Sequence, residues 1–181
     1  MILQLEWKTV PAWMIGFSSD TRADLIAGDP GIRCHMAEIV VAREVELADV
    51  ATFYDECGYI GAPSGSEIVL AARDANQLLG AVRLCFEEDV IVLRGMQVRP
   101  GYERRGLGSQ LLRACVPFLD ARLSYCLPYT HLVSFYRAVS FEVAQPSQLP
   151  SFLAARLAAY LAEGHAVLAM RRASCNPAGR V

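Results

Sequence analysis

The sequence predicts a mixed α/β (α+β) domain around one mostly antiparallel sheet flanked by helices. Three extended segments, residues 67–73, 78–87 and 90–98, are separated only by short polar turns, which is the pattern of an antiparallel meander. Residues 151–163 instead place apolar side chains at helical spacing. Hydrophobic residues make up 54% of the 181 residues and charged residues 20%, which provides enough apolar material for a packed core and argues against disorder.

The other elements follow from local patterns. β-Branched residues predict a strand over 39–45, and Gly58 ends a helix predicted over 47–57. A loop over 61–66 and turns over 74–77 and 87–89 separate the meander strands. After the meander we expect a helix over 106–119, a strand over 123–127, a helix over 131–139, an extended piece over 141–143, a helix over 151–163 capped by Ser151, a strand over 165–170 and a frayed tail from Arg171.

Charge and hydropathy exclude several classes of protein. The formal net charge is −2, without the basic surplus typical of nucleic-acid binders. The apolar stretch over 10–17 is too short to span a membrane, and Glu6 stands where a secretory signal peptide would be basic. We therefore expect a cytoplasmic protein without a nucleic-acid or membrane partner.

The cysteines and histidines predict neither disulfides nor a metal site. The six cysteines are scattered and include no CxxC pair, and the three histidines share no ligand spacing with them or with one another. Cys85 and Cys115 lie among apolar residues and are interpreted as small buried side chains. Cys126 lacks a convincingly placed histidine base, so we assign it a structural role.

Residues 1–35 differ from the rest of the chain. Both tryptophans and the only lysine lie here, and the hydrophobic periodicity is poor. One interpretation is that Met36 is the natural start of the protein; the other is that this segment is a genuine arm packed on the domain. The predicted organisation is an N-terminal extension of uncertain origin over 1–35, a domain over 36–172 and a flexible tail over 173–181.

The chemistry-bearing segment is 92–112, which reads as a strand, a sharp turn and a helix. Gly106 and Gly108 allow a ligand to approach the backbone closely. The helix that begins there directs unpaired N–H groups and a positive dipole end outward, which suits a phosphate. Arg104 and Arg105 add positive charge and forked donors. The segment therefore predicts a pyrophosphate cradle.

The segment does not match either of two common nucleotide-binding motifs. The dinucleotide fingerprint lacks its third glycine, and a Walker A loop would need a Gly-Lys-Ser/Thr ending. The segment instead resembles motif A of the GCN5-related N-acetyltransferase (GNAT) family, through Val98, Pro100, Gly106 and Gly108. One departure is Glu103, which occupies the position where the family has Arg or Gln.

A second match lies about thirty residues further along. Phe135, Tyr136 and Phe141 resemble the F-Y-x-x-x-G-F pattern of the family's motif B, with Ser140 in place of the glycine. Tyr129 stands where the family often has Asn. The order of the predicted elements agrees with the family as well, and the resemblance covers about residues 37–145.

The resemblance implies a binding mode for acetyl-CoA as co-substrate. The motif A strand would splay from the next strand and open a slot for the pantetheine arm, and the turn over 104–109 would hold the pyrophosphate. Tyr136 would be the general acid that protonates the departing thiolate. The coenzyme-binding residues implied are Gln97, Val98, Arg104, Arg105, Gly106, Leu107, Gly108 and Ser109.

The resulting functional prediction is transfer of acetyl from acetyl-CoA to a primary amine, a small molecule, by direct attack. Two alternatives are a non-catalytic acyl-CoA-binding or sensing module and a protein or peptide N-acetyltransferase. The linker after the first helix is shorter than the family's usual second helix, so one wall of the acceptor site would be open or covered by another element. A homodimer is common in the family, and nothing in the sequence fixes one.

Other polar residues have two interpretations each. His131 would be an acceptor-side base or, as we favour, a capping or surface residue. Arg83 and Arg94 would clamp a substrate carboxylate or pair with acidic neighbours, and we favour the pairing. The turn over 87–89 would be solvated, although one of its carboxylates could attract a cationic amine.

Overall fold

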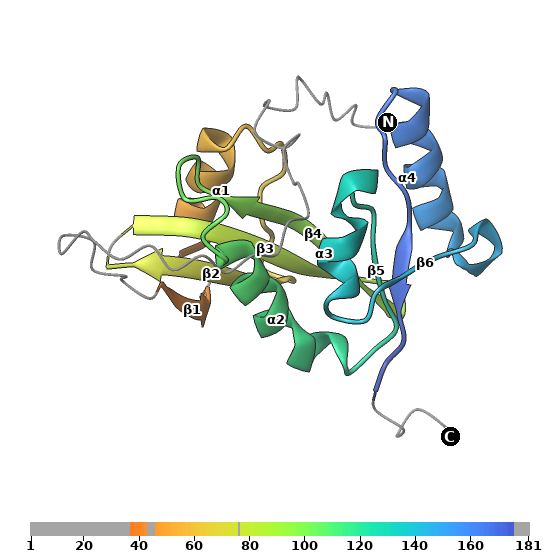
Figure 1. The fold of residues 1–181 in the computed structure, drawn as a ribbon, viewed down its shortest axis with the longest axis horizontal. Helices are drawn as coiled ribbons and strands as arrows, with labels where there is room; N and C mark the ends of the chain where they lie inside the picture. Colours follow the sequence, from red (N-terminus) through yellow and green to blue (C-terminus); the bar gives the residue numbers. More distant parts are fainter. Residues whose placement is uncertain (1–36, 43–45, 76, 176–181) are drawn as a thin grey trace, which may run out of the picture.

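The computed structural model describes residues 37–42, 46–75 and 77–175 (Figure 1). The predictions for residues 1–36, for the end of the first strand at 43–45 and for the tail beyond 175 lie outside these ranges. The described strands form one seven-stranded sheet in the order β1-β2-β3-β4-β5-β7-β6. Their bounds are β1 Glu38–Val41, β2 Ile68–Asp74, β3 Gln77–Glu87, β4 Val90–Val98, β5 Ser124–Cys126, β6 Glu142–Val143 and β7 Met170–Arg172.

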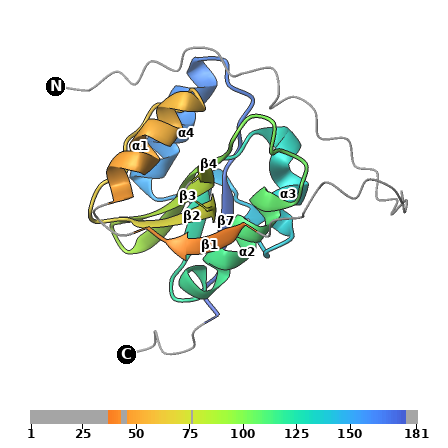
Figure 2. The same ribbon diagram turned by 90° about the vertical axis from the view of Figure 1, so that its left-hand side faces the viewer.

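Helices cover both faces of this sheet. Helices α1 and α4 lie on one face, and α2 and α3 lie on the other (Figure 2). The bounds are α1 Leu47–Glu56, α2 Leu107–Leu119, α3 Val133–Arg137 and α4 Ser151–Ala162, with short 3₁₀ helices at Thr130–Leu132 and Pro146–Gln148. The predicted mixed α/β class, with mostly antiparallel pairing, is confirmed.

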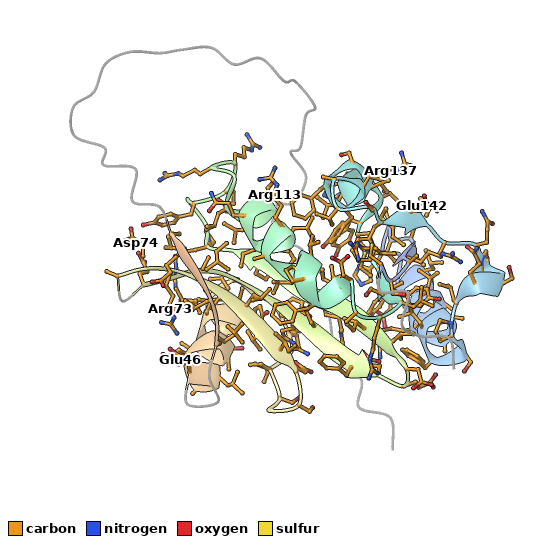
Figure 3. The ribbon with its side chains drawn as sticks, turned by 90° about the horizontal axis from the view of Figure 1, so that it is seen from below. Glu46, Arg73, Asp74, Arg113, Arg137 and Glu142 are labelled. Carbon is orange, nitrogen blue, oxygen red and sulfur yellow. The ribbon has the colours of Figure 1, made fainter. Side chains whose placement is uncertain are left out.

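Each helix layer has its own core. The largest core cluster joins α2 and α3 to the sheet and includes Leu84, Leu111 and Tyr136. Helix α1 packs on the opposite face through a second cluster that includes Phe53. Its N-terminal end is also tied to β2, where Arg73 Nη2 lies 3.9 Å from Glu46 Oε1 (Figure 3). Helix α4 packs through Leu153 beside α1, over the β4 and β5 end of the same face.

Strands β4 and β5 are the parallel pair of the described sheet, and they separate after a short contact. Their register includes only Ile91 with Ser124 and Val92 with Tyr125. Strand β4 then continues to Val98, whereas β5 ends at Cys126. The splayed central pair expected from the family resemblance is therefore present. We call the Val92–Tyr125 pair the vertex of the splay.

A β-bulge follows directly after the vertex. Arg83 pairs with Arg94 but Ala81 pairs with Gln97, so β4 carries one extra residue over this interval. Gly95 has a φ of +61°, and a Cβ built on it would lie 2.9 Å from the Tyr54 hydroxyl. The bulge therefore requires glycine at this position. It also brings the Gly95 backbone close to Tyr54 of α1.

The end of the chain differs most from the prediction. Strand β7 covers Met170–Arg172, whereas residue Val167 forms only an isolated bridge with Tyr129. The expected strand over 165–170 is thus placed too early, and Arg171 and Arg172 are not frayed. The reason is a polar anchor: the buried Arg172 donates from Nε to the Val139 carbonyl at 2.9 Å and pairs with Asp120.

Two helix predictions also need correction. The helix expected over 131–139 is divided into a 3₁₀ turn and the short α3. Ser151 is the first residue of α4 and provides no side-chain cap, because Pro150 occupies the N-cap position. Pro150 has a φ of −55°, near the value the pyrrolidine ring imposes, and it cannot donate a backbone hydrogen bond.

Candidate active site

The turn between β4 and α2 is closed by its own residues. The Gly101 amide donates to Glu103 Oε2 at 2.6 Å, and the Tyr102 amide donates to the Arg99 carbonyl at 3.0 Å. Glu103 therefore bonds the backbone of its own turn, which gives a structural role to the residue that departs from motif A. Gly106 then takes the left-handed conformation, with a φ of +79°, as the N-cap of α2.

The N-terminus of α2 forms an open cradle. The amides of Leu107, Gly108 and Ser109 are the first of the helix and have no partner within it. A Cβ built on Gly106 meets nothing within 4 Å, and the flanking Arg104 and Arg105 are exposed. This space, the helix dipole and the two guanidinium groups fit a pyrophosphate.

Three of the predicted cradle residues have additional packing roles. The Leu107 side chain is buried in the core, so only its backbone is available to a ligand. The Arg105 guanidinium lies 5.1 Å from the Tyr102 ring centroid, which orients it on the turn. A Cβ on Gly108 would lie 3.7 Å from Phe135 and Val98, an ordinary van der Waals contact, so α2 packs against α3 and β4 at this residue without requiring glycine.

The free edge of β4 faces the splay. The Arg99 amide donates to the Leu79 carbonyl of β3 at 2.7 Å. Because backbone groups alternate between the two edges of a strand, those of Gln97 also turn toward β3 and those of Val98 and Met96 turn toward the splay. Val98 thus lies where an extended arm could add to the edge. Met96 is absent from the predicted coenzyme-binding residues, because the prediction overlooks the bulge that sets this alternation; the isolated Gly95 within a predicted strand is the signal that could have indicated it.

Tyr136 lies in the core beside the splay. Its side chain is 6% exposed, with the Phe135 and Phe141 rings edge-on at 5.0 and 6.0 Å between centroids. Burial raises the pKa of its phenol well above 10, and Cys126, Cys115 and Tyr59 raise it further. Tyr59 itself belongs to the core on the opposite face of the sheet.

The arginines on the α1 face pair with acidic neighbours. Arg83 Nε lies 2.9 Å from Glu67 Oε2, and Arg94 Nη1 lies 3.5 Å from Glu87 Oε1. The favoured interpretation of both residues as ion-paired is confirmed. Glu87, however, is not part of a solvated turn: it is the last residue of β3, and Arg156 of α4 binds both of its carboxylate oxygens.

The segment between α1 and β2 is a loop that is held to the sheet. Residues 57–67, between α1 and β2, contain no helix. Arg83 holds this loop to the sheet by donating from Nη1 to the carbonyls of Gly61 at 2.8 Å and Ala62 at 3.0 Å. Helix α4 lies beside α1 on the same face (Figure 2). That α4 covers the acceptor wall next to the short linker stays a prediction.

The remaining candidates have surface or packing roles. His131 is exposed and stacks on Tyr129 with 5.7 Å between ring centroids. Cys85, Cys115 and Cys126 are buried as expected, and burial raises the pKa of the Cys115 thiol to about 12. Within the described ranges, no group of three or more His, Cys, Asp or Glu side chains could hold a metal ion, and no helix is long and apolar enough to cross a membrane.

Comparison with known proteins agrees with this geometry. Residues 64–143 match the acetyltransferase (GNAT) domain family. The matched segment contains both motifs, so the match agrees with the resemblance that they carry. No match was found among curated proteins.

Solved structures share the fold at low sequence identity. The ribosomal-protein-S18-alanine N-acetyltransferase from Escherichia coli is 14% identical, with a TM-score of 0.58, over 81% of this chain and 99% of that one. A GNAT-family acetyltransferase from Streptococcus pneumoniae is 16% identical, with a TM-score of 0.58, over 76% and 98%. N-acetylglutamate synthase from Neisseria gonorrhoeae, complexed with coenzyme A and L-arginine, is 15% identical, with a TM-score of 0.57, over 78% of this chain but only 34% of that one.

Proposed function

We propose that this protein is an acetyl-CoA-dependent N-acetyltransferase that acts on the primary amine of a small molecule. The observation that carries the proposal is the combination of the open cradle at Gly106 with the splay of β4 from β5. The cradle follows β4 directly, so a coenzyme held there can extend its arm along the free edge of that strand. Acetyl-CoA supplies the acyl group as an activated thioester.

The cradle residues would bind the coenzyme. The first amides of α2, with Arg104 and Arg105, would hold the pyrophosphate. Backbone groups of Val98 and Met96 would bond the pantetheine arm as an added strand does. The arm would enter at the wide end of the splay, next to α2, and place its thioester toward the vertex.

Tyr136 would act as the general acid. Its raised pKa keeps the phenol protonated through the neutral range, which is the state that a proton donor requires. The amine nitrogen attacks the thioester carbonyl carbon; the C–N bond forms, the C–S bond breaks, and the phenol donates its proton to the departing sulfur. The proton released by the acetylated nitrogen then restores the phenol.

Coenzyme binding is tested by calorimetric titration of the full chain with acetyl-CoA, using the matched variants Gly106→Asp and Gly106→Asn. Both side chains tolerate the left-handed conformation better than most, and only Asp adds a negative charge beside the cradle. We expect the Asp variant to bind about 5- to 30-fold more weakly than the Asn variant, because one charge–charge contact is worth on the order of 1–2 kcal/mol here. A folded wild-type protein that binds neither acetyl-CoA nor coenzyme A contradicts the proposal.

Assays of acetyl transfer distinguish the proposed function from its two alternatives. A non-catalytic acyl-CoA sensor would bind the coenzyme but acetylate nothing. A protein acetylase would label peptides of a cell lysate and leave a small-molecule extract unlabelled. Mass spectrometry with carbon-13-labelled acetyl-CoA reads out all three cases without a thiol reagent, which the protein's own cysteines would consume.

A further inference from the structure

Two arginines, Arg94 and Arg156, and one glutamate, Glu87, lie close together on the α1 and α4 face. Arg156 donates from Nη1 and Nη2 to both carboxylate oxygens of Glu87, at 3.1 and 2.7 Å. Arg94 Nη1 lies 3.5 Å from the same carboxylate and makes no hydrogen bond to a described residue. The side chains of Arg94, Arg156 and Glu87 are 25%, 25% and 22% exposed. Two half-buried cations therefore share one anion.

The neighbouring ion pair of Arg83 and Glu67 adds no net negative charge that could neutralise Arg94. Arg83 is the cross-strand partner of Arg94, but its own charge is matched by Glu67 and its donors by two loop carbonyls. The excess positive charge thus remains at Arg94. Its planar guanidinium offers a pair of parallel N–H donors, which suits the two oxygens of a carboxylate.

Arg94 lies close to the vertex, where the proposed function places the reacting thioester. It lies two residues past the last β4 residue that pairs with β5 and immediately before the Gly95 bulge. Its side chain lies on the α1 and α4 face, opposite the cradle face formed by α2 and α3. If the thioester lies at the vertex, as proposed above, an amine that approaches from this face passes Arg94.

We propose that the acceptor is a primary amine that carries a carboxylate, as an amino acid does, and that Arg94 binds this carboxylate. The inference rests on the proposed acetyltransferase function and specifies its substrate class. Arg156 acts as a positioning residue: it hydrogen-bonds both oxygens of Glu87, so Arg94, which contacts the same carboxylate only at 3.5 Å, keeps its N–H donors available for the substrate. A polyamine or another purely cationic acceptor is disfavoured by the excess positive charge.

The test compares acids with their amides. Wild-type protein and carbon-13-labelled acetyl-CoA are incubated with the twenty common amino acids, with the matching amino-acid amides and with a small-molecule extract of cells. We expect labelled products to carry a carboxylate and the amide of the best amino acid to lose about 10- to 100-fold in kcat/KM, the cost of one hydrogen-bonded charge pair.

Arg94→Gln provides the second arm of the test. It should lower kcat/KM for the acid by about the same factor, leave the slow reaction of the amide unchanged and leave acetyl-CoA binding intact. Arg122→Gln, at an exposed arginine in the turn before β5, is the matched control. Equal acetylation of acid and amide, or labelled products without a carboxylate, overturns the inference and leaves the proposed function standing. Coenzyme binding without any labelled product contradicts both.

Discussion

Tyr136 combines a buried ring with a hydroxyl that we propose as the general acid. Aromatic packing by Phe135 and Phe141 fixes the ring, and desolvation holds the phenol in its neutral form. The same burial would suit a tyrosine that only fills the core. A substitution that keeps the ring and removes the hydroxyl separates the two roles.

We predict that Tyr136→Phe lowers kcat by about 100- to 1000-fold, because a positioned general acid contributes on that order. Acetyl-CoA affinity should change little, since the ring remains. Single-turnover acetylation followed by mass spectrometry measures the first effect, and calorimetry the second. Unchanged turnover would assign Tyr136 to the core alone.

Tyr54 shapes the backbone next to the vertex. Its buried hydroxyl donates to the Gly95 carbonyl at 2.9 Å and closes the bulge from the α1 side. We predict that Tyr54→Phe costs about 1–2 kcal/mol of unfolding free energy, because it leaves that carbonyl without its donor. A shifted bulge should also lower kcat by about 10-fold while the KM for acetyl-CoA stays nearly constant. Denaturant unfolding and initial rates measure the two effects; a loss of stability with full kcat would restrict Tyr54 to a structural role.

The cradle was the part of the site that could be predicted from sequence. Gly106 and the two arginines before it are consecutive residues, so local pattern is sufficient to place them together. Arg94 and Arg156, which meet at Glu87, come from a strand and a helix far apart in the chain. Their meeting depends on sheet register and on the docking of α4, which no local pattern encodes.

At the scale of elements, α4 is the least expected component. Its helical periodicity predicts the helix but not the face of the sheet that it covers. Leu153 packs against Val92 and Tyr125, and Arg156 fastens the helix to the end of β3 through Glu87. The misplaced last strand has the same origin: the apolar run at 165–170 resembles a strand, whereas the anchor of β7 is the polar Arg172.

We predict that Arg156→Met destabilises the protein by about 1–2 kcal/mol, the worth of a partly buried bidentate ion pair. Met keeps the apolar stem of the side chain, so the loss reports on the charge contact rather than on packing. Amide hydrogen exchange should accelerate in α4 more than in α2. Arg113→Met, on the exposed side of α2, is the matched control, and equal effects of the two variants would mean that Glu87 does not hold α4.

At the scale of the whole molecule, an ion pair of the last described strand, β7, connects elements that are far apart in sequence. Arg172 of β7 binds Asp120 at the end of α2 and the Val139 carbonyl after α3, so it joins three elements far apart in sequence. The cytoplasmic location, the absence of nucleic-acid and membrane partners and the oligomeric state stay predictions of the sequence. The contribution of this ion pair can be measured on the folded chain.

The hydrogen bond from Arg172 lowers the pKa of the Asp120 carboxyl below its ordinary value of 3.8. A carboxyl with a lowered folded-state pKa stabilises the protein above its unfolded-state pKa, and this contribution is lost as the pH falls through the folded-state value. We therefore predict that Asp120→Asn reduces the unfolding free energy at pH 7 and that the difference from wild type shrinks below about pH 4. Urea unfolding between pH 7 and pH 3 measures this, with Asp89→Asn in the exposed β3–β4 turn as the control. A difference that stays constant over this range would mean that the Asp120 charge does not contribute, and that Arg172 anchors β7 through the Val139 carbonyl alone.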